Sequence, residues 1–188
     1  MHIKWNYYEK RARDLFYTDD QTQLLIVVGN HDIGFHYDMT RQKIERFTRS
    51  FNNSMVQLHV PSKQSSVQFV LLNSMTLEDD GCTFCKQAQR ELNQLNQTLE
   101  CLKQKKSDQS MLLSKKCQDL LNKQHLNQNL IYSRPIIFMH YPLYRDSDAI
   151  CPNDIDAELS VSKRSNQNRE SYDCLSRKST NQVFLIVF

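Results

Sequence analysis

The chain has 188 residues, 39% of them hydrophobic, and a formal net charge of +3, which allows one domain with a sizeable core. Its basic residues are scattered and do not alternate with aromatic ones, so no nucleic-acid partner is expected. No apolar run approaches the roughly 20 residues that cross a bilayer, and the N-terminus lacks the pattern of a secretory signal. With only three glycines, the chain is poor in the usual residue of catalytic loops.

The first half of the chain alternates helical and strand patterns. Apolar residues recur at helical spacing over residues 5–17, and residues 24–28 form a continuous apolar run typical of a strand covered on both faces. Thr40 is a suitable N-cap for the helix that should follow it. Residues 67–72 predict a second strand.

The second half opens on the clearest periodicity of the sequence. Residues 85–102 predict an amphipathic helix with a narrow apolar seam. The seam consists of Cys85, Ala88, Leu92, Leu95, Leu99 and Leu102. Residues 103–129 are polar, with a short helix expected near 111–121; residues 135–139 predict a third strand and residues 172–179 a further helix. Strands alternating with helices predict a layered α/β fold.

Six cysteines leave several chemistries open. Cys82-Thr83-Phe84-Cys85 is a C-x-x-C motif, which is compatible with a redox pair, with half of a zinc site, or with halves of two separate disulfides. A second C-x-x-C is absent, so a zinc ribbon is not expected. Two glycosylation sequons, at Asn52 and Asn96, favour a lumenal setting together with the even cysteine count.

Polar residues follow two of the predicted strands at the point where each strand ends. The first strand runs into Gly29-Asn30-His31-Asp32, and the third runs into His140. Because sites in open α/β sheets lie beyond the carboxyl ends of strands, we expect the imidazoles of His31 and His140 to point into a shared cleft from neighbouring parallel strands. Asn30 and His140 are candidate metal ligands. His31 is a candidate general acid, and Asp32 is expected to orient it by accepting a ring N–H.

Three more residues lie close to these groups along the chain. His36 follows the first group and is either a pocket residue or a structural one. Tyr144 and Arg145 follow His140, and the forked guanidinium of Arg145 suits a phosphate oxygen as well as an ordinary salt bridge. We treat all three as candidate substrate contacts.

Longer stretches around these residues carry a resemblance to a known family. They are residues 28–37, Asn73-Ser74-Met75 with Asp80-Gly81-Cys82, residues 140–145, and residues 172–177. Over roughly residues 5–181 the chain resembles the calcineurin-like metallophosphoesterases, whose third motif block reads G-N-H-[DE]. Within them it is similar to the membrane-anchored branch that remodels GPI anchors.

The resemblance implies a four-layer α/β/β/α sandwich around two divalent metal ions, most often manganese. It implies that Asn30 and His140 ligate metal, that His31 protonates the leaving group and that Asp32 orients His31. The two metals would polarise a phosphodiester and activate a bridging water. The implied substrate is the GPI-anchor glycan, from which ethanolamine phosphate is removed to support transport from endoplasmic reticulum to Golgi. The implied location is the membrane of these compartments, with a lumenal catalytic domain held by segments that this chain lacks.

The family's D-x-H, G-D-x-x-D and G-H-x-H blocks do not occur in this sequence. Two neutral donors without a carboxylate offset little of the hydration that two dications lose. We therefore expect residues 1–188 to form a single incomplete phosphoesterase domain, with a helical and polar insertion at 85–129 and an out-of-family tail at 183–188. The isolated chain is expected neither to hold the binuclear centre nor to hydrolyse phosphodiesters.

Two other classes of function stay open on the sequence. A non-catalytic interaction protein would use the amphipathic helix at 85–102 to bind a partner. A thiol redox module would use Cys82 and Cys85, and would require a reactive thiolate there.

Overall fold

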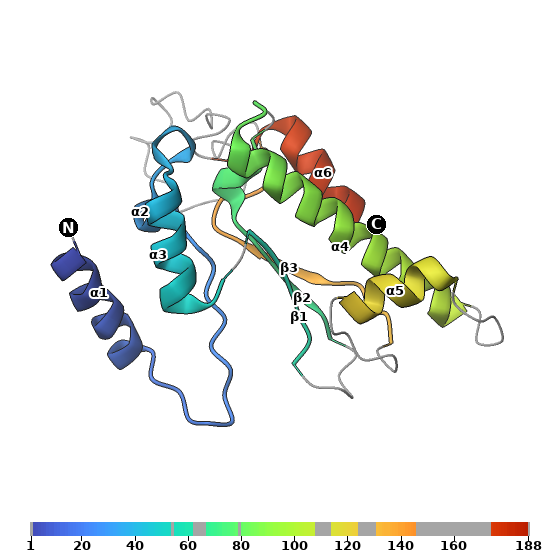
Figure 1. Cartoon of the computed structure of the whole chain (residues 1–188), viewed down its shortest axis with the longest axis horizontal. Helices are drawn as coiled ribbons and strands as arrows, with labels where there is room; N and C mark the ends of the chain where they lie inside the picture. The colour runs from blue at the N-terminus through green and yellow to red at the C-terminus, as the bar shows by residue number, and fades with distance from the viewer. Residues whose placement is uncertain are drawn as a thin grey trace, which may run out of the picture.

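The computed structural model describes residues 2–53, 55–61, 67–78, 80–107, 114–123, 131–145 and 174–187. A small sheet lies at the centre, and α4 crosses it with α6 alongside (Figure 1). The α/β class expected from the sequence is confirmed. The α-helices are α1 (His2–Leu15), α2 (Asn30–Ile33), α3 (Arg41–Phe51), α4 (Thr83–Ser107), α5 (Lys115–Lys123) and α6 (Arg177–Val187), and the 3-10 turns are η1 (His36–Asp38) and η2 (Ser74–Thr76).

The sheet has the strand order β1-β2-β3. β2 (Phe69–Leu72) and β3 (Ile136–Met139) run parallel and confirm two of the predicted strands. β1 (Val56–His59) pairs antiparallel with β2 and was not predicted. Because β2 and β3 are parallel, the residues that follow them, Asn73 and His140, emerge at the same edge of the sheet.

The strand predicted at residues 24–28 is wrong. This segment leads from α1 into α2 without a strand assignment, and in the described part of the chain it has no ladder partner. An apolar run becomes a strand only when a neighbour supplies hydrogen bonds, so the hydrophobic pattern alone did not decide the conformation. Val28 still contributes to the core, with 3% of its surface exposed.

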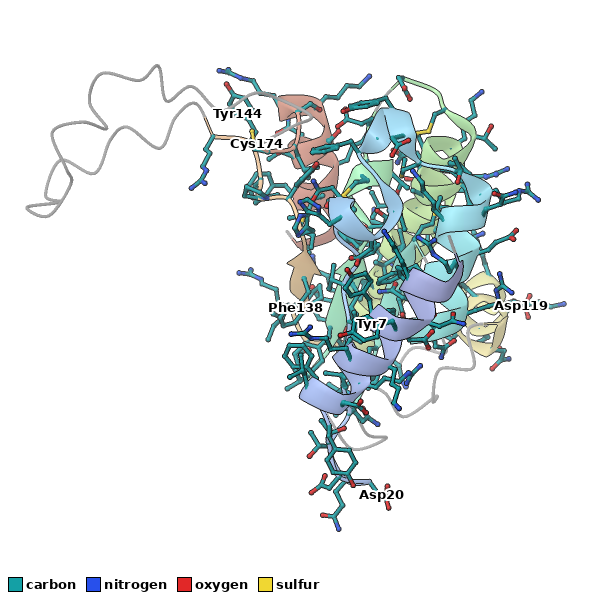
Figure 2. The ribbon with its side chains drawn as sticks, turned by 90° about the vertical axis from the view of Figure 1, so that its left-hand side faces the viewer. Tyr7, Asp20, Asp119, Phe138, Tyr144 and Cys174 are labelled. Carbon is teal, nitrogen blue, oxygen red and sulfur yellow. A yellow bond between two sulfur atoms is a disulfide. The ribbon has the colours of Figure 1, made fainter. Side chains whose placement is uncertain are left out.

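The two faces of the sheet differ in cover. Val70, Leu72, Ile137 and Met139 share one face and pack into the main core with α4. The other face carries Phe69, Ile136 and Phe138, and the latter two are 50% and 44% exposed. Figure 2 shows Phe138 on the outer side of the molecule. The described residues contain one sheet, so the four-layer sandwich implied by the resemblance is not seen in them.

The helices that frame the site follow local sequence rules. Thr40 caps α3 as predicted, because its Oγ1 accepts a hydrogen bond from the N–H of Lys43. Arg46 in α3 stacks its guanidinium over the Trp5 ring and donates to the carbonyl of Asp32. These contacts tie α1, α2 and α3 together around the Gly29 corner.

The predicted amphipathic helix is confirmed as the longer α4. Its seam is buried, from 0% exposed at Ala88 and Leu102 to 5% at Cys85, and a disulfide from Cys101 to Cys117 fastens α5 to it. Because the seam packs into the core of its own chain, it is not free to bind a partner. The interaction-protein reading of residues 85–102 therefore loses its apolar surface.

The C-terminal part of the chain also packs on α4. The helix predicted from residue 172 begins at Arg177, and residues 172–173 lie outside the described ranges. Val183 in α6 is 2% exposed and belongs to the core. The out-of-family tail at 183–188 stays a prediction. Among the described helices, none combines the length and apolar content that a membrane span requires.

Candidate functional site

Gly29 forms the corner where the apolar segment turns into α2. Its backbone N–H donates to Asp32 Oδ2 at 2.8 Å, which is the half of a capping box that needs no side chain at the N-cap. A Cβ on Gly29 would lie 3.3 Å from two atoms of the His140 ring and 3.4 Å from Asp32 Oδ2. Glycine therefore leaves room for the imidazole to approach the backbone closely.

Asn30 and His140 meet at this corner, although 110 residues separate them in sequence. Asn30 Oδ1 lies 2.8 Å from His140 Nε2, a hydrogen-bond distance that requires Nε2 to carry the proton. We call these two residues the Asn–His pair. The pair brings together the two candidate metal ligands, and the His140 side remains exposed to solvent.

His31 and Asp32 lie in α2 beside the pair. His31 is exposed. The premise that a strand carries this residue is wrong, because His31 lies in α2 and the segment before it is not a strand. The structure gives Asp32 a helix-capping role through its Oδ2, and in the described part of the chain no hydrogen bond joins it to His31. The acid role of His31 and the orienting role of Asp32 stay predictions.

The strand ends are tied to each other below the pair. Ser74 is fully buried at the start of η2, and its Oγ accepts from the N–H of Tyr141 at 3.0 Å. Asn73 accepts from the N–H of Met75 through its side-chain oxygen. The segment after β2 therefore fixes the backbone on which His140 sits.

The segment after β2 also positions His36. The Nδ1 of His36 lies 2.9 Å from the Met75 carbonyl oxygen, and its Nε2 lies 2.8 Å from Asp80 Oδ2. Burial by itself lowers the pKa of His36. The hydrogen bonds to Asp80 and Met75 and the negative charges of Asp80 and Glu78 outweigh burial, so the pKa lies above its ordinary value.

Asp80 is held from two sides. The backbone N–H of Cys82 donates to Oδ1 at 2.9 Å, and this bond together with the His36 ring holds the pKa of Asp80 below its usual range. Cys82 forms a disulfide with Cys85 at the start of α4. Donor atoms of His36, Asp80, Cys82 and Cys85 all lie within 4.8 Å of one another. We call these four residues the His–Cys group. Sequence reasoning left His36 and the C-x-x-C motif as separate features and missed their association.

The remaining sequence candidates lie near α6. Tyr144 donates its backbone N–H to Thr180 Oγ1 at 2.8 Å, and its hydroxyl accepts from Arg177. The Arg145 carbonyl accepts a weak bond from the buried thiol of Cys174. Figure 2 shows Tyr144 and Cys174 close together at this end of the molecule. The substrate-contact roles of His36, Tyr144 and Arg145 stay predictions.

Comparisons with known proteins connect this arrangement to one group of enzymes. The chain is 34% identical over 174 residues to Metallophosphoesterase 1 of Cricetulus griseus, which covers 93% of this chain and 39% of that protein. It is 34% identical over 186 residues to Metallophosphoesterase 1 of Xenopus laevis, covering 97% and 43%, and 35% identical over 174 residues to that of Gallus gallus, covering 93% and 40%. Over this length the chain is similar to these metallophosphoesterases.

The coverage is unequal in the two directions. The chain matches along nearly its whole length but spans only 39–43% of the length of these relatives. No family model matches the chain, and no solved structure matches it. The similarity to metallophosphoesterases therefore rests on the curated relatives.

The family name implies divalent metal ions, and the Asn–His pair can be tested for its fit to them. The pair offers one amide oxygen and one imidazole nitrogen, both neutral. In the described residues, the one cluster of three or more His, Cys, Asp or Glu donors is the His–Cys group, which does not include the pair. The pair alone does not fit a centre of two dications, because such a centre needs several anionic ligands.

Proposed function

We propose that this chain forms part of the catalytic region of a metallophosphoesterase that removes ethanolamine phosphate from the glycan of GPI anchors. The observation that carries the proposal is the contact of 2.8 Å between Asn30 and His140 at one edge of the sheet. The relatives support the hydrolase class, and the resemblance to the GPI-remodelling branch supports the substrate. The proposed setting is the lumenal side of membranes of the endoplasmic reticulum and Golgi.

In this proposal each residue of the site has a defined task. Asn30 and His140 contribute neutral ligands to metal binding, with manganese as the expected ion. His31 is exposed and sits one residue from the pair, so it can deliver a proton to the leaving alkoxide. Asp32 uses Oδ2 to hold the Gly29 corner, which leaves Oδ1 to orient the His31 ring.

We also propose that the 188-residue chain by itself neither holds two manganese ions nor hydrolyses phosphodiesters. The reason is the donor chemistry of the Asn–His pair, which has no carboxylate. Calorimetric titration of the chain with Mn²⁺ tests this point. Tight binding of two ions per chain would contradict it.

A chimera tests the enzymatic proposal. Residues of this chain replace the matched segment of the Gallus gallus relative, and the product is expressed in cells that lack their own Metallophosphoesterase 1. The expected result is loss of ethanolamine phosphate from GPI glycans, measured by mass spectrometry. His31→Ala should slow the reaction roughly 10²–10⁴-fold, the usual contribution of a general acid. Asn30→Ala and His140→Ala should abolish it.

The control variant is His59→Ala, which removes an imidazole of β1 that bonds to Gln23 away from the pair. This variant should leave turnover unchanged. A folded chimera that cleaves bis(4-nitrophenyl) phosphate but not the GPI glycan would contradict the substrate. A folded chimera that cleaves neither would contradict the hydrolase role of this segment.

A further inference from the structure

The His–Cys group has the composition of a metal site. His36 comes from η1, Asp80 from the loop after η2, and the two cysteines from the N-terminal end of α4. One imidazole, one carboxylate and two sulfurs form a set of four donors, and all four donor atoms lie within 4.8 Å of one another. Zn²⁺ takes four ligands of these types in tetrahedral sites. The C-x-x-C motif, which supplies two ligands, is completed here by residues from two other segments.

The separations are close to those that a metal requires. With Zn–S near 2.3 Å and Zn–N or Zn–O near 2.0 Å, donor atoms in a tetrahedral site lie about 3.3–3.8 Å apart. Cys85 Sγ lies 3.9 Å from Nδ1 of His36, and Asp80 Oδ2 lies 2.8 Å from Nε2 of the same ring. Because Cys85 Sγ faces Nδ1, the side chains have to rotate before an ion can contact Nε2, the carboxylate and both sulfurs.

Hydrogen bonds around the group already fix its donors. The Met75 carbonyl holds the proton on Nδ1 of His36, which leaves Nε2 as the nitrogen that can ligate. The N–H of Cys85 points at Cys82 Sγ at 2.9 Å, and the N–H of Cys82 bonds to Asp80. These two N–H groups also stabilise negative charge on a thiolate and on a carboxylate. The N-terminus of the 25-residue helix α4 does the same.

The pairing of His36 with Asp80 indicates where positive charge belongs. With Nδ1 protonated, the lone pair of Nε2 faces a carboxylate oxygen at 2.8 Å. This contact is repulsive unless a proton or a cation lies between the two atoms. In the disulfide form a proton takes that place. A metal ion can take it once the sulfurs are free.

We propose that reduction of the Cys82–Cys85 disulfide converts the His–Cys group into a binding site for one zinc ion. The ligands are His36 Nε2, a carboxylate oxygen of Asp80, and the sulfurs of Cys82 and Cys85. This site is separate from the Asn–His pair and does not depend on the proposed phosphodiesterase function.

The conversion balances in two steps. A dithiol reductant transfers two electrons and two protons to the disulfide, which becomes two thiols while the reductant becomes a disulfide. Zn²⁺ then binds both sulfurs as thiolates and releases their two protons to water. The proton on His36 Nε2 also leaves when the metal takes its place. Oxidation of the two thiolates to the disulfide reverses the process and releases the ion.

Both reductant and metal can reach the site. Cys85 lines a surface cavity of about 340 Å³ together with Glu78, Gly81 and Lys86. Asp80 is 54% exposed along its side chain, so it can swing onto the ion or leave its position to water. Cys82 is half-buried, whereas Cys85, Cys101 and Cys117 are all buried, so a reductant reaches this disulfide at Cys82.

The test is a titration of the 188-residue chain with Zn²⁺ alone, before and after reduction by a phosphine. We expect one zinc per reduced chain and none bound tightly by the disulfide form. Co²⁺ in place of Zn²⁺ should show the intense visible bands of tetrahedral coordination and thiolate charge transfer. X-ray absorption of the zinc form should show two sulfur and two nitrogen or oxygen neighbours.

Variants separate this site from the other cysteines. Cys82→Ser with Cys85→Ser should weaken zinc binding by roughly 100-fold or more, and Asp80→Asn by roughly tenfold. The matched control is Cys101→Ser with Cys117→Ser, which removes the other disulfide and should leave binding unchanged. Because Asp80 is exposed, its variant should fold even where a change at buried Cys85 disturbs the helix.

Four outcomes would overturn the proposal. The reduced chain could bind no zinc, or zinc binding could survive the loss of Cys82 and Cys85, or it could vanish in the Cys101 and Cys117 control. A His36→Gln variant that keeps full affinity would also contradict the ligand set. Weaker zinc binding in the Cys82 and Cys85 double variant, together with weaker binding in the His36 and Asp80 variants, would support it.

Discussion

Two groups of polar side chains are attached to the segment that follows β2, and they differ in completeness. The Asn–His pair holds two neutral donors beside the Ser74 anchor, whereas the His–Cys group holds four donors, three of which can carry negative charge. Asn30 and His140 lie in two of the sequence stretches that carry the resemblance to the metallophosphoesterases. The His–Cys group also includes residues of these stretches, but it has more ligands than the pair and more of them can be negatively charged.

The difference teaches that proximity alone does not make a metal site. Both groups bring together residues that are distant in sequence, and both rest on hydrogen bonds to the turn at Ser74 and Met75. The number of anionic ligands determines whether a dication gains enough binding free energy to offset its lost hydration. We therefore expect the two groups to respond differently to the changes below.

Gly34→Ala should have the largest effect on the free energy of unfolding. Gly34 joins α2 to η1 and so connects the two groups. Its φ is +93°, and an added Cβ would lie 2.7 Å from Asp38 Oδ2. The strained backbone and the clash should cost about 2–3 kcal/mol. Urea unfolding monitored by circular dichroism measures the loss. A variant as stable as the parent would contradict the described turn.

Ser74→Ala should come next. Ser74 is 0% exposed, and its hydroxyl is the recorded acceptor for the N–H of Tyr141, next to His140. Loss of this buried hydrogen bond should cost about 1–1.5 kcal/mol. The same urea experiment measures it, with Ser133→Ala as a comparison, because the Ser133 Oγ has no hydrogen-bond partner among the described residues. An equal effect in the two variants would remove the special role given to Ser74.

Gly29→Ala should disturb the Asn–His pair but not the His–Cys group. The new Cβ would meet the His140 ring at 3.3 Å, and the exposed ring can yield by a few tenths of an ångström. The expected cost is about 1 kcal/mol. Proton NMR of the histidine rings should show a shifted His140 signal with the His36 signal unchanged. A change confined to His36 would contradict the separation of the two groups.

A pH dependence of stability should be the smallest effect. The pKa of His36 is raised, so the stabilisation it gains from Asp80 is complete below about pH 6.5 and is lost as the pH rises through the raised value. The pKa of Asp80 is lowered, so on the acid side the stabilisation is lost only as the pH falls through that low value. The partner carboxylate is more than half exposed, so the change should stay below about 1 kcal/mol.

The measurement compares the free energy of unfolding at about pH 6 and about pH 8.5 with the disulfides intact. Asp80→Asn should remove the decrease between the two values. Asp38→Asn, which breaks the exposed pair with Lys43, should leave that decrease in place. A decrease that persists in the Asp80 variant would assign the pH dependence to another group.

The sequence predicted those parts of the fold that local chemistry determines. The Thr40 cap, the seam of α4 and the strands at 67–72 and 135–139 depend on side-chain type and periodicity, and the structure confirms them. The strand at 24–28 was wrong because a strand needs a partner that a periodicity does not reveal. β1 was missed because it is only four residues long and half buried.

The candidate site was predicted in part for the same reason. Polar residues after strand ends predicted that the imidazoles of His31 and His140 share a cleft, and the structure brings His140 into contact with Asn30, the residue before His31. One of the two expected strands is absent. The His–Cys group could not be predicted because His36 carries no local signal of its own, and six cysteines allow fifteen pairings. The spacing Asp80-Gly81-Cys82-Thr83-Phe84-Cys85 contained three of its four donors, and only the fold placed His36 beside them.

The most direct test of the account is calorimetric titration of the reduced 188-residue chain with Zn²⁺ and, separately, with Mn²⁺. The account predicts one tightly bound zinc, no tight binding of manganese, and the same zinc isotherm in the double variant Asn30→Ala with His140→Ala. Two tightly bound manganese ions per chain, or loss of the zinc site in that double variant, would contradict it.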